Sequence, residues 1–188
     1  MKIIATFGPQ QAGKSEAAKA IATLPRWTRL SFAEPLYAML SALLGEDARK
    51  LDKSASHPFL CGKTLRQALQ SLGTEWGRGQ IGKTIWLDVM DGVLRYHHAA
   101  GSAGVVIDDL RFLNEYQFLR SRGAALIRIE REGCLIPTLN QGHASEMDWC
   151  GFAPDKVLRN NGGIEDFHNF ARNIAEVAPH AERPTTNA

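Results

Sequence analysis

The sequence predicts an α/β protein in which a parallel five-stranded sheet is flanked by helices. Short apolar runs alternate along the chain with longer segments of helical periodicity. A helix between successive strands brings them into one parallel sheet that is covered on both faces. Strands in such a sheet are apolar along their whole length. In addition, a glycine-rich loop separates the first apolar run from the first helical segment, as in proteins that bind phosphate at the start of a helix.

Five segments have the length and apolar character of strands in such a sheet. We expect the strands at Lys2–Phe7, Trp27–Phe32, Gly104–Asp108, Ala124–Ile129 and Lys156–Arg159. In parallel sheets, ligands bind at the carboxyl ends of the strands. The residues that follow each strand are therefore the first candidates for a functional site.

Six segments carry helical signals. We expect helices at Ser15–Leu24, Glu34–Leu44, a segment capped by Thr64, Thr84–Ala99, Phe112–Arg122 and Ile164–Val177. Glycines should interrupt the helix that Thr64 caps, at Gly73, Gly77, Gly79 and Gly82. The spacing of apolar residues predicts which face of two of these helices points inward. In Ile164–Val177 this face is Ile164, Phe167, Phe170 and Ile174, and in Thr84–Ala99 it is Ile85, Val89 and Val93.

The remaining segments lack a clear period. Residues 46–62 should be irregular, with room for one short helix. Residues 134–142 should form a loop and 144–150 a short helix, and the tail from residue 179 should be disordered.

Composition limits the class of protein. A formal net charge of +2 argues against a nucleic-acid binder that relies on bulk charge. Three cysteines without a Cys-x-x-Cys pair favour free thiols. The chain has no apolar run of about 18 residues, so we expect no membrane span. It begins with the first strand, so we also expect no signal peptide. These features fit a cytoplasmic enzyme.

The loop after the first strand, Gly8–Ser15, has the phosphate-binding pattern of Gly, four residues, Gly, Lys and Ser. Its glycines let the backbone curl so that N–H groups point at phosphate oxygens, and the following helix presents its positive end to the same anion. Lys14 reaches the β and γ phosphates, and the Ser15 hydroxyl can bind Mg²⁺. The loop predicts a nucleoside triphosphate. Its candidate binding residues are Gly8, Gln11, Ala12, Gly13, Lys14, Ser15 and Glu16.

Acidic and basic side chains follow the third strand. Asp108 and Asp109 are both candidates to hold Mg²⁺ or its water shell. Arg111 can grip a phosphate with its guanidinium group, or it can form a surface ion pair with Glu115 at i+4.

The segment from Arg66 to Trp86 is rich in polar side chains. Arg66, Gln70 and Arg78 can share a helical face if the helix continues through Gly73, and this set suits a phosphate and a base edge. The alternative is a solvated helix face. Trp86 is equally suited to the core and to stacking on a base.

Together these segments resemble the phage-type deoxynucleoside monophosphate kinases. The resemblance runs from Met1 to about Val177 and is specific in the order and spacing of its motifs. The motifs are Ser31–Leu36, Leu65–Glu75 with Arg78, Asp109–Phe112 with Asn114 and Glu115, His143–Glu146, and Asn160–Gly163.

The resemblance implies a P-loop kinase domain over residues 1–178, with a helical substrate-binding insertion at about 33–100 and a short lid at about 131–150. It implies ATP and Mg²⁺ as cofactors and phosphoryl transfer to a deoxynucleoside 5′-monophosphate. It also implies a monomer or homodimer in the cytoplasm, which would be the host cytoplasm if a phage encodes the protein. Neither nucleic acid nor a membrane is an expected partner.

The resemblance also implies roles for single residues. Lys14, Asp109, Arg111 and Arg131, which begins the lid, would be catalytic. Ser15 with Asp108 or Asp109 would hold the metal, and Asn161 and Gly162 would lie against adenine. The acceptor would be bound by Phe32, Ala33, Arg66, Gln70, Glu75, Arg78, Trp86, Arg111, His143 and Glu146.

The chain departs from the family pattern in three places. Pro9, Gln10 and Gln11 are bulkier than usual, Glu16 stands where Thr is frequent, and Asp108 makes an acidic pair. Two other functions fit the phosphate loop. One is a small-molecule kinase of the same fold, such as a dephospho-coenzyme A kinase, and the other is a non-catalytic regulatory protein that binds ATP.

Overall fold

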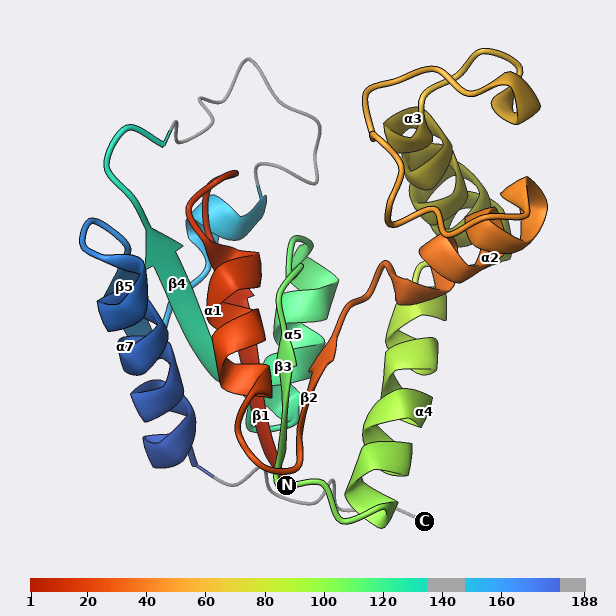
Figure 1. The fold of residues 1–188 in the computed structure, drawn as a ribbon. Coiled ribbons are helices and arrows are strands. Elements are labelled where there is room, and N and C mark those ends of the chain that lie inside the picture. The colour runs from red at the N-terminus through yellow and green to blue at the C-terminus, as the bar shows by residue number, and fades with distance from the viewer. Residues whose placement is uncertain (135–147, 180–188) are drawn as a thin grey trace, which may run out of the picture. The chain divides into compact units, whose positions relative to one another are not determined.

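The computed structural model describes residues 1–134 and 148–179 (Figure 1). These residues form two compact units. One unit combines Met1–Ser31 with the chain from Val93 onward, and the other is Phe32–Gly92. Of the sequence predictions, the short helix at 144–150, most of the loop at 134–142, and the residues His143 and Glu146 lie outside the described residues, as does the tail from residue 180.

The first unit is built on a sheet of five parallel strands, which confirms the predicted fold class. The strands are β1 (Lys2–Phe7), β2 (Trp27–Leu30), β3 (Gly104–Ile107), β4 (Ala125–Glu130) and β5 (Lys156–Arg159). Their order across the sheet is β2-β3-β1-β4-β5, and every neighbouring pair is parallel. The carboxyl ends of β1, β3, β4 and β5 therefore meet at one edge of the sheet, where the predicted site residues follow.

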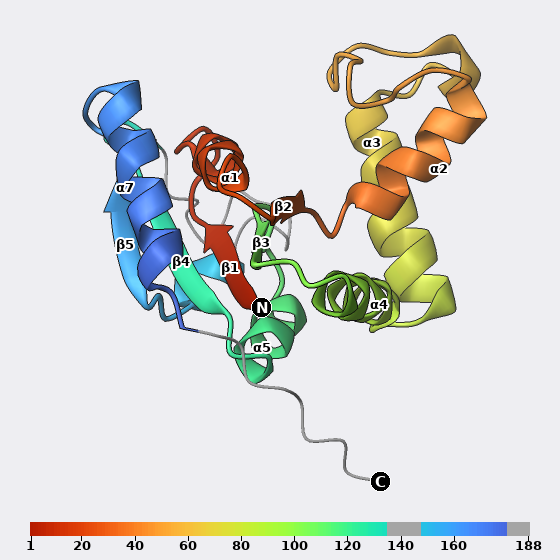
Figure 2. The ribbon, with the colours of Figure 1, turned by 60° about the horizontal axis from the view of Figure 1, so that its bottom comes forward.

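Helices cover both faces of this sheet (Figure 2). On one face, α1 (Lys14–Ala22) and α7 (Ile164–Val177) pack over Ile4 of β1 in the main core. On the other face lies α5 (Leu113–Ser121), whose Tyr116 stacks on Phe152. Phe152 in turn meets the edge of Phe7 of β1. Ile4 and Phe7 point to opposite faces because successive side chains alternate across a strand.

The second unit is helical. It contains α2 (Glu34–Leu44), the 3-10 helix η1 (Pro58–Leu60), α3 (Leu65–Gln70), the π-helix η2 (Ser71–Ile81) and the start of α4 (Ile85–Ala99). Thr64 caps α3 as predicted, in a capping box with Gln67. The small core of the unit gathers Tyr37, Leu40, Leu44, Ala48 and Leu65.

The predicted interruption at Gly73, Gly77 and Gly79 is wrong. The helix continues through them as η2 and ends at Gly82, whose N–H donates to the carbonyl of Gly77. Helical glycine lacks a side chain, and the structure uses that space at Gly77, where the ring of Trp86 lies. A Cβ there would come within 2.4 Å of the ring. The packing of Trp86 therefore outweighs the low helix propensity of glycine.

Two predicted inward faces are correct only in part. In α4 the buried residues are Trp86, Met90 and Leu94, and Val89 is exposed. In α7, Phe167 is buried and Ile174 packs against the core, as predicted, whereas Ile164 and Phe170 are 54% and 58% exposed. The other buried residues of α7 are Ala171, Ala175 and, just after its end, Ala178. The alanines of α7 let it pack closely against the alanine-rich α1, and Phe167 is the large side chain that this contact buries.

The 3-10 helix η3 (Asp148–Gly151) lies between β4 and β5 in the sequence. Cys61, Cys134 and Cys150 are free, as expected. Among residues 1–134 and 148–179, no helix has the length and apolar character needed to cross a membrane.

Candidate active site

The loop between β1 and α1 has a backbone that requires glycine at two positions. Gly8 has φ +134° and Gly13 has φ +108°, both in the region that side chains disfavour. A Cβ on Gly8 would also lie 2.3 Å from the carbonyl oxygen of Ile129, and one on Gly13 would lie 2.5 Å from Nδ2 of Asn160. Gln11 also has a positive φ, +65°. The Gly-x₄-Gly spacing therefore follows from how closely this loop is packed.

Lys14 folds back over the same loop. Its Nζ donates to the carbonyl oxygens of Gly8 at 3.0 Å and Pro9 at 2.6 Å. Burial, followed by the positive charge of Arg111, lowers the pKa of Lys14 to about 8, while Asp108 and Cys134 act in the opposite direction. The site thus holds a partly desolvated cation that an anion would stabilise.

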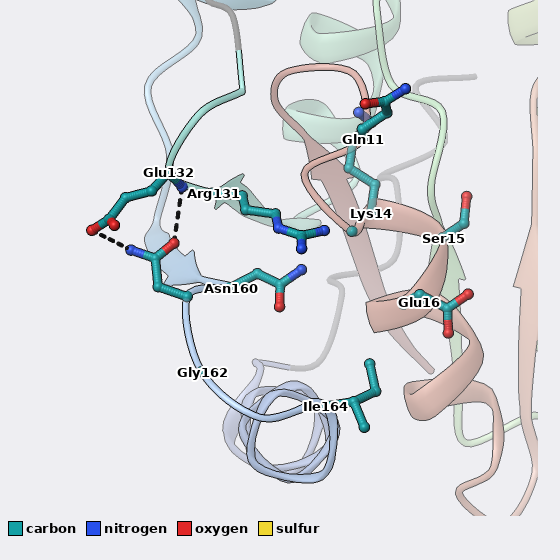
Figure 3. A pocket seen from close by; sticks show the side chains of 11 residues that line it. Gln11, Lys14, Ser15, Glu16, Arg131, Glu132, Asn160, Gly162 and Ile164 are labelled. Carbon is teal, nitrogen blue, oxygen red and sulfur yellow. Dashed lines mark hydrogen bonds between the residues drawn. The ribbon is translucent and has the colours of Figure 1, made fainter.

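A cavity of about 620 Å³ opens beside this loop (Figure 3). Its lining comes from the start of α1, from the segment after β4, and from the turn between β5 and α7. The lining residues are Gln11, Gly13, Lys14, Ser15, Glu16, Arg131, Glu132, Asn160, Asn161, Gly162 and Ile164. Figure 3 shows Arg131 directed into the cavity toward Lys14.

The structure therefore brings together most of the residues predicted to bind the phosphate donor. Gly8 and Ala12 are buried within the loop. Glu132 also lines the cavity and was not predicted, and so does Asn160, which belongs to the Asn160–Gly163 motif but was not given a role of its own. Asn160 donates to the carbonyl of Ala12, 148 positions away, and no local signal in the sequence indicates such a contact.

Glu16, at the start of α1, lies beside Lys19 and His168. Its carboxylate accepts from Lys19 Nζ at 2.6 Å, and its other oxygen lies 3.7 Å from Nε2 of His168. The hydrogen bond from Lys19 holds the pKa of Glu16 below its usual value. Glu16 is therefore paired with a lysine of its own helix before any phosphate binds.

The two acids after β3 have different partners. The side chain of Asp108 is 4% exposed, and its Oδ2 accepts from Nη2 of Arg29 at 2.6 Å and from Nε at 3.1 Å. Asp109 accepts from the hydroxyl of Ser31 at 2.7 Å. Arg29 was not predicted as a site residue, because its partner is 79 positions away.

Glu115 caps the start of α5. Its Oε2 accepts from the backbone N–H groups of Arg111 at 3.0 Å and Phe112 at 3.1 Å, and the residue is 2% exposed. This contact fixes the backbone at Arg111. The guanidinium group of Arg111 is near enough to Lys14 to lower its pKa.

The donor set fits a magnesium ion held largely by phosphate and water. In the described part of the chain, no three His, Cys, Asp or Glu side chains gather as a metal cage. Mg²⁺ usually takes only one or two protein ligands when it binds with a nucleotide. Ser15 follows Lys14 in the sequence, Asp108 is near enough to raise the pKa of Lys14, and Asp109 is the next residue after Asp108. Ser15 and one of these aspartates would be enough protein ligands for such an ion.

The predicted acceptor residues of the second unit have mixed surroundings. Arg66, Gln70 and Glu75 are exposed, and Glu75 accepts from Ser71 Oγ at 2.6 Å. The carbonyl oxygen of Gly73 accepts from Nη1 of Arg78 at 3.1 Å and from Nε1 of Trp86 at 2.8 Å.

Two aromatic residues from the predicted acceptor site are buried. Phe32 and Trp86 are each 5% exposed, and Ala33 is half-buried. The indole N–H of Trp86 is already engaged, which favours the core alternative for this residue.

Comparisons with known proteins agree on the family. The family model described as deoxynucleotide monophosphate kinase matches residues 62–170, more than half of the chain. A protein of Acanthamoeba polyphaga mimivirus, provisionally named a deoxynucleotide monophosphate kinase, is 29% identical over 187 residues, covering 90% of this chain and 93% of the viral one.

A solved structure was also found to be similar. It is an unliganded sugar kinase from Janibacter sp. HTCC2649, with a TM-score of 0.49, 12% identity, and coverage of 95% of this chain and 96% of that one. We draw no inference from so distant a likeness. The match to the family model, together with a phosphate loop on a parallel sheet, shows that the chain belongs to the deoxynucleotide monophosphate kinase family.

Proposed function

We propose that the protein transfers the γ-phosphoryl group of ATP to a deoxynucleoside 5′-monophosphate and releases ADP and the diphosphate. Membership of the family supports a nucleotide kinase. The observation that carries the proposal is the continuous cavity that joins the phosphate loop at Gly13 and Lys14 to Asn161 and Gly162. We infer that this one space takes both the polyphosphate and the base of the donor.

In this proposal the donor lies along that cavity. The N–H groups of the loop and the positive end of α1 bind the phosphates, and Lys14 leaves the loop carbonyls to contact them. Arg131 lies over the same space and balances charge that develops during transfer. The backbone at Asn161 and Gly162 contacts the base.

Ser15 and Asp109 would hold Mg²⁺, which supplies charge neutralisation at the phosphates when it is bound. Asp108, which Arg29 already holds, would support the same site from behind. The reaction needs no covalent intermediate, because in-line positioning and charge balance account for most phosphoryl-transfer catalysis.

Acceptor binding is assigned to Arg66, Gln70, Glu75 and Arg78 of the second unit and to Arg111. Their proposed role is to fix the acceptor phosphate and present the base edge with hydrogen-bonding partners. Phe32 and Trp86, both buried, would support this surface rather than contact the nucleotide.

A coupled assay of ADP release tests the proposal. The panel contains ATP with each deoxynucleoside monophosphate, each ribonucleoside monophosphate, and dephospho-coenzyme A. We expect turnover with at least one deoxynucleotide and its loss in Lys14→Ala, with unchanged thermal melting. Turnover with dephospho-coenzyme A alone would show that the protein is a dephospho-coenzyme A kinase. ATP binding without any turnover would favour a non-catalytic regulatory protein.

A further inference from the structure

Two neighbouring asparagines after β5 tie together loops that are far apart in the sequence. The side chain of Asn160 donates to the carbonyl oxygen of Ala12 at 2.9 Å, and its backbone N–H donates to the backbone carbonyl oxygen of Glu130 at 2.8 Å. Asn161 exchanges two hydrogen bonds with Glu132: it accepts from the Glu132 N–H and donates to its Oε1, both at 2.9 Å. The segments after β1, β4 and β5 are thus joined at the cavity wall (Figure 3).

The contact from Asn160 acts on the phosphate loop. The carbonyl of Ala12 and the N–H of Gly13 belong to one planar trans peptide, so they point in opposite directions. Holding the Ala12 oxygen on Asn160 therefore fixes the direction of the Gly13 N–H. Gly13 lines the cavity, and its N–H is one of the loop donors available to a phosphate.

The same amide also occupies space that only glycine leaves. A Cβ on Gly13 would lie 2.5 Å from Nδ2 of Asn160 and 3.3 Å from the ring of Phe167. Gly13 and Asn160 therefore depend on each other in both volume and hydrogen bonding.

The pair of Asn161 and Glu132 acts on a different part of the wall. Both ends of the Asn161 amide are engaged, one with the backbone and one with the side chain of Glu132. This reciprocal contact sets the separation between the segments that carry Arg131 and Gly162. The hydrogen bonds that the structure gives for the side chains of Asn161 and Glu132 do not include one to the phosphate loop.

We propose that Asn160 and Asn161 are positioning residues with separate tasks in donor binding. Asn160 orients the phosphate loop for the triphosphate, and Asn161 with Glu132 fixes the wall that meets the nucleoside of the same donor. The inference rests on the proposed function, in which this cavity takes a nucleoside triphosphate.

Two probes separate the tasks: inorganic tripolyphosphate, which has no nucleoside, and ATP. Their dissociation constants are measured by calorimetry, well below the melting temperature of each variant. Asn160→Ala and Asn160→Leu should weaken both probes by about tenfold, the value of one hydrogen bond in this setting. Asn161→Ala should weaken ATP several-fold and leave tripolyphosphate unchanged. Asn173→Ala, an exposed asparagine of α7, is the matched control and should bind both probes normally.

Several outcomes would overturn the inference. If Asn160→Leu binds like the wild type while Asn160→Ala does not, Asn160 only fills space. If Asn161→Ala weakens both probes equally, the two tasks are not separate. A fall in melting temperature with unchanged binding assigns a purely structural role. Wild-type protein that binds both probes, with no variant affected, overturns the inference alone, whereas wild-type protein that binds neither overturns the proposed function and the inference with it.

Discussion

Lys14 is partly buried, and its lowered pKa should make nucleotide binding depend on pH. Burial lowers its pKa to about 8. Bound phosphates favour the protonated form, so binding takes up a proton wherever free Lys14 is neutral. ATP affinity should therefore be constant below pH 8 and fall by up to about tenfold for each unit above it.

The measurement is the ATP dissociation constant from about pH 7 to about pH 9.5, above the titration of phosphate itself near pH 6. Lys14→Arg is the matched control, because a guanidinium keeps its charge across this range. Its affinity should be independent of pH, even if it is weaker overall. The same decline in Lys14→Arg would assign the pH dependence to another group.

The acidic pair after β3 divides into two predicted roles. Arg29 holds the buried Asp108, so Asp108→Asn should destabilise the fold by about 1–2 kcal/mol through the loss of a charge-assisted contact. Its magnesium dependence should change little. Asp109→Asn should shift the magnesium titration of turnover to higher concentration and leave melting nearly unchanged. A larger shift from Asp108→Asn would exchange the two assignments.

At the scale of the element, the π-helix η2 depends on Gly77. A Cβ there would meet three atoms of the Trp86 ring at 2.4, 2.8 and 2.9 Å. Trp86 is 5% exposed and also donates to Gly73, so it has little freedom to move. Gly77→Ala should therefore destabilise the protein by about 1–3 kcal/mol, as overpacking does.

Gly92→Ala in α4 provides the opposite case. A Cβ at Gly92 would meet no atom within 4 Å, so the substitution should stabilise the helix by up to about 1 kcal/mol. Thermal or urea unfolding of both variants gives the comparison. Equal effects of the two substitutions would mean that helix propensity, and not contact with Trp86, governs η2.

Local patterns were enough to predict the elements that position the site. The five strands, the Thr64 cap and the phosphate loop each depend on residues close together in the sequence, so their signals survive without tertiary information. The predicted inward faces of α4 and α7 were wrong at Val89, Ile164 and Phe170, because both helices carry apolar residues on more than one face. Neighbouring helices then decide which face is buried, and α7 buries alanines rather than Phe170.

The supporting contacts of the site were not predictable in the same way. Asn160 reaches Ala12, and Arg29 reaches Asp108, across large sequence separations. An asparagine after a strand and an arginine within a short strand are ordinary residues in those places. Only the order of strands, which sets β2 beside β3 and β5 beside β4, brings such partners into range.

At the scale of the whole molecule, positive charge is nearly balanced by negative charge, so the position of each cationic side chain matters more than their number. The chain has 22 basic and 20 acidic residues, so general attraction of a polyanion is weak. Two phosphorylated substrates repel each other, and cationic groups must offset that repulsion where transfer occurs. We predict that Arg66, Arg78 and Arg111 serve the acceptor phosphate, because a guanidinium supplies paired donors as well as charge.

Arg66→Lys, Arg78→Lys and Arg111→Lys should each raise the KM for the acceptor by about tenfold or more, the value of one charged hydrogen bond. If the contact tightens as charge shifts during transfer, kcat falls as well. The KM for ATP should change little. Arg172→Lys is the control, because Arg172 lies on α7 with Asn169 as its partner. A defect confined to the ATP dependence would move that arginine to the donor site, and unchanged kinetics would leave it as a surface residue.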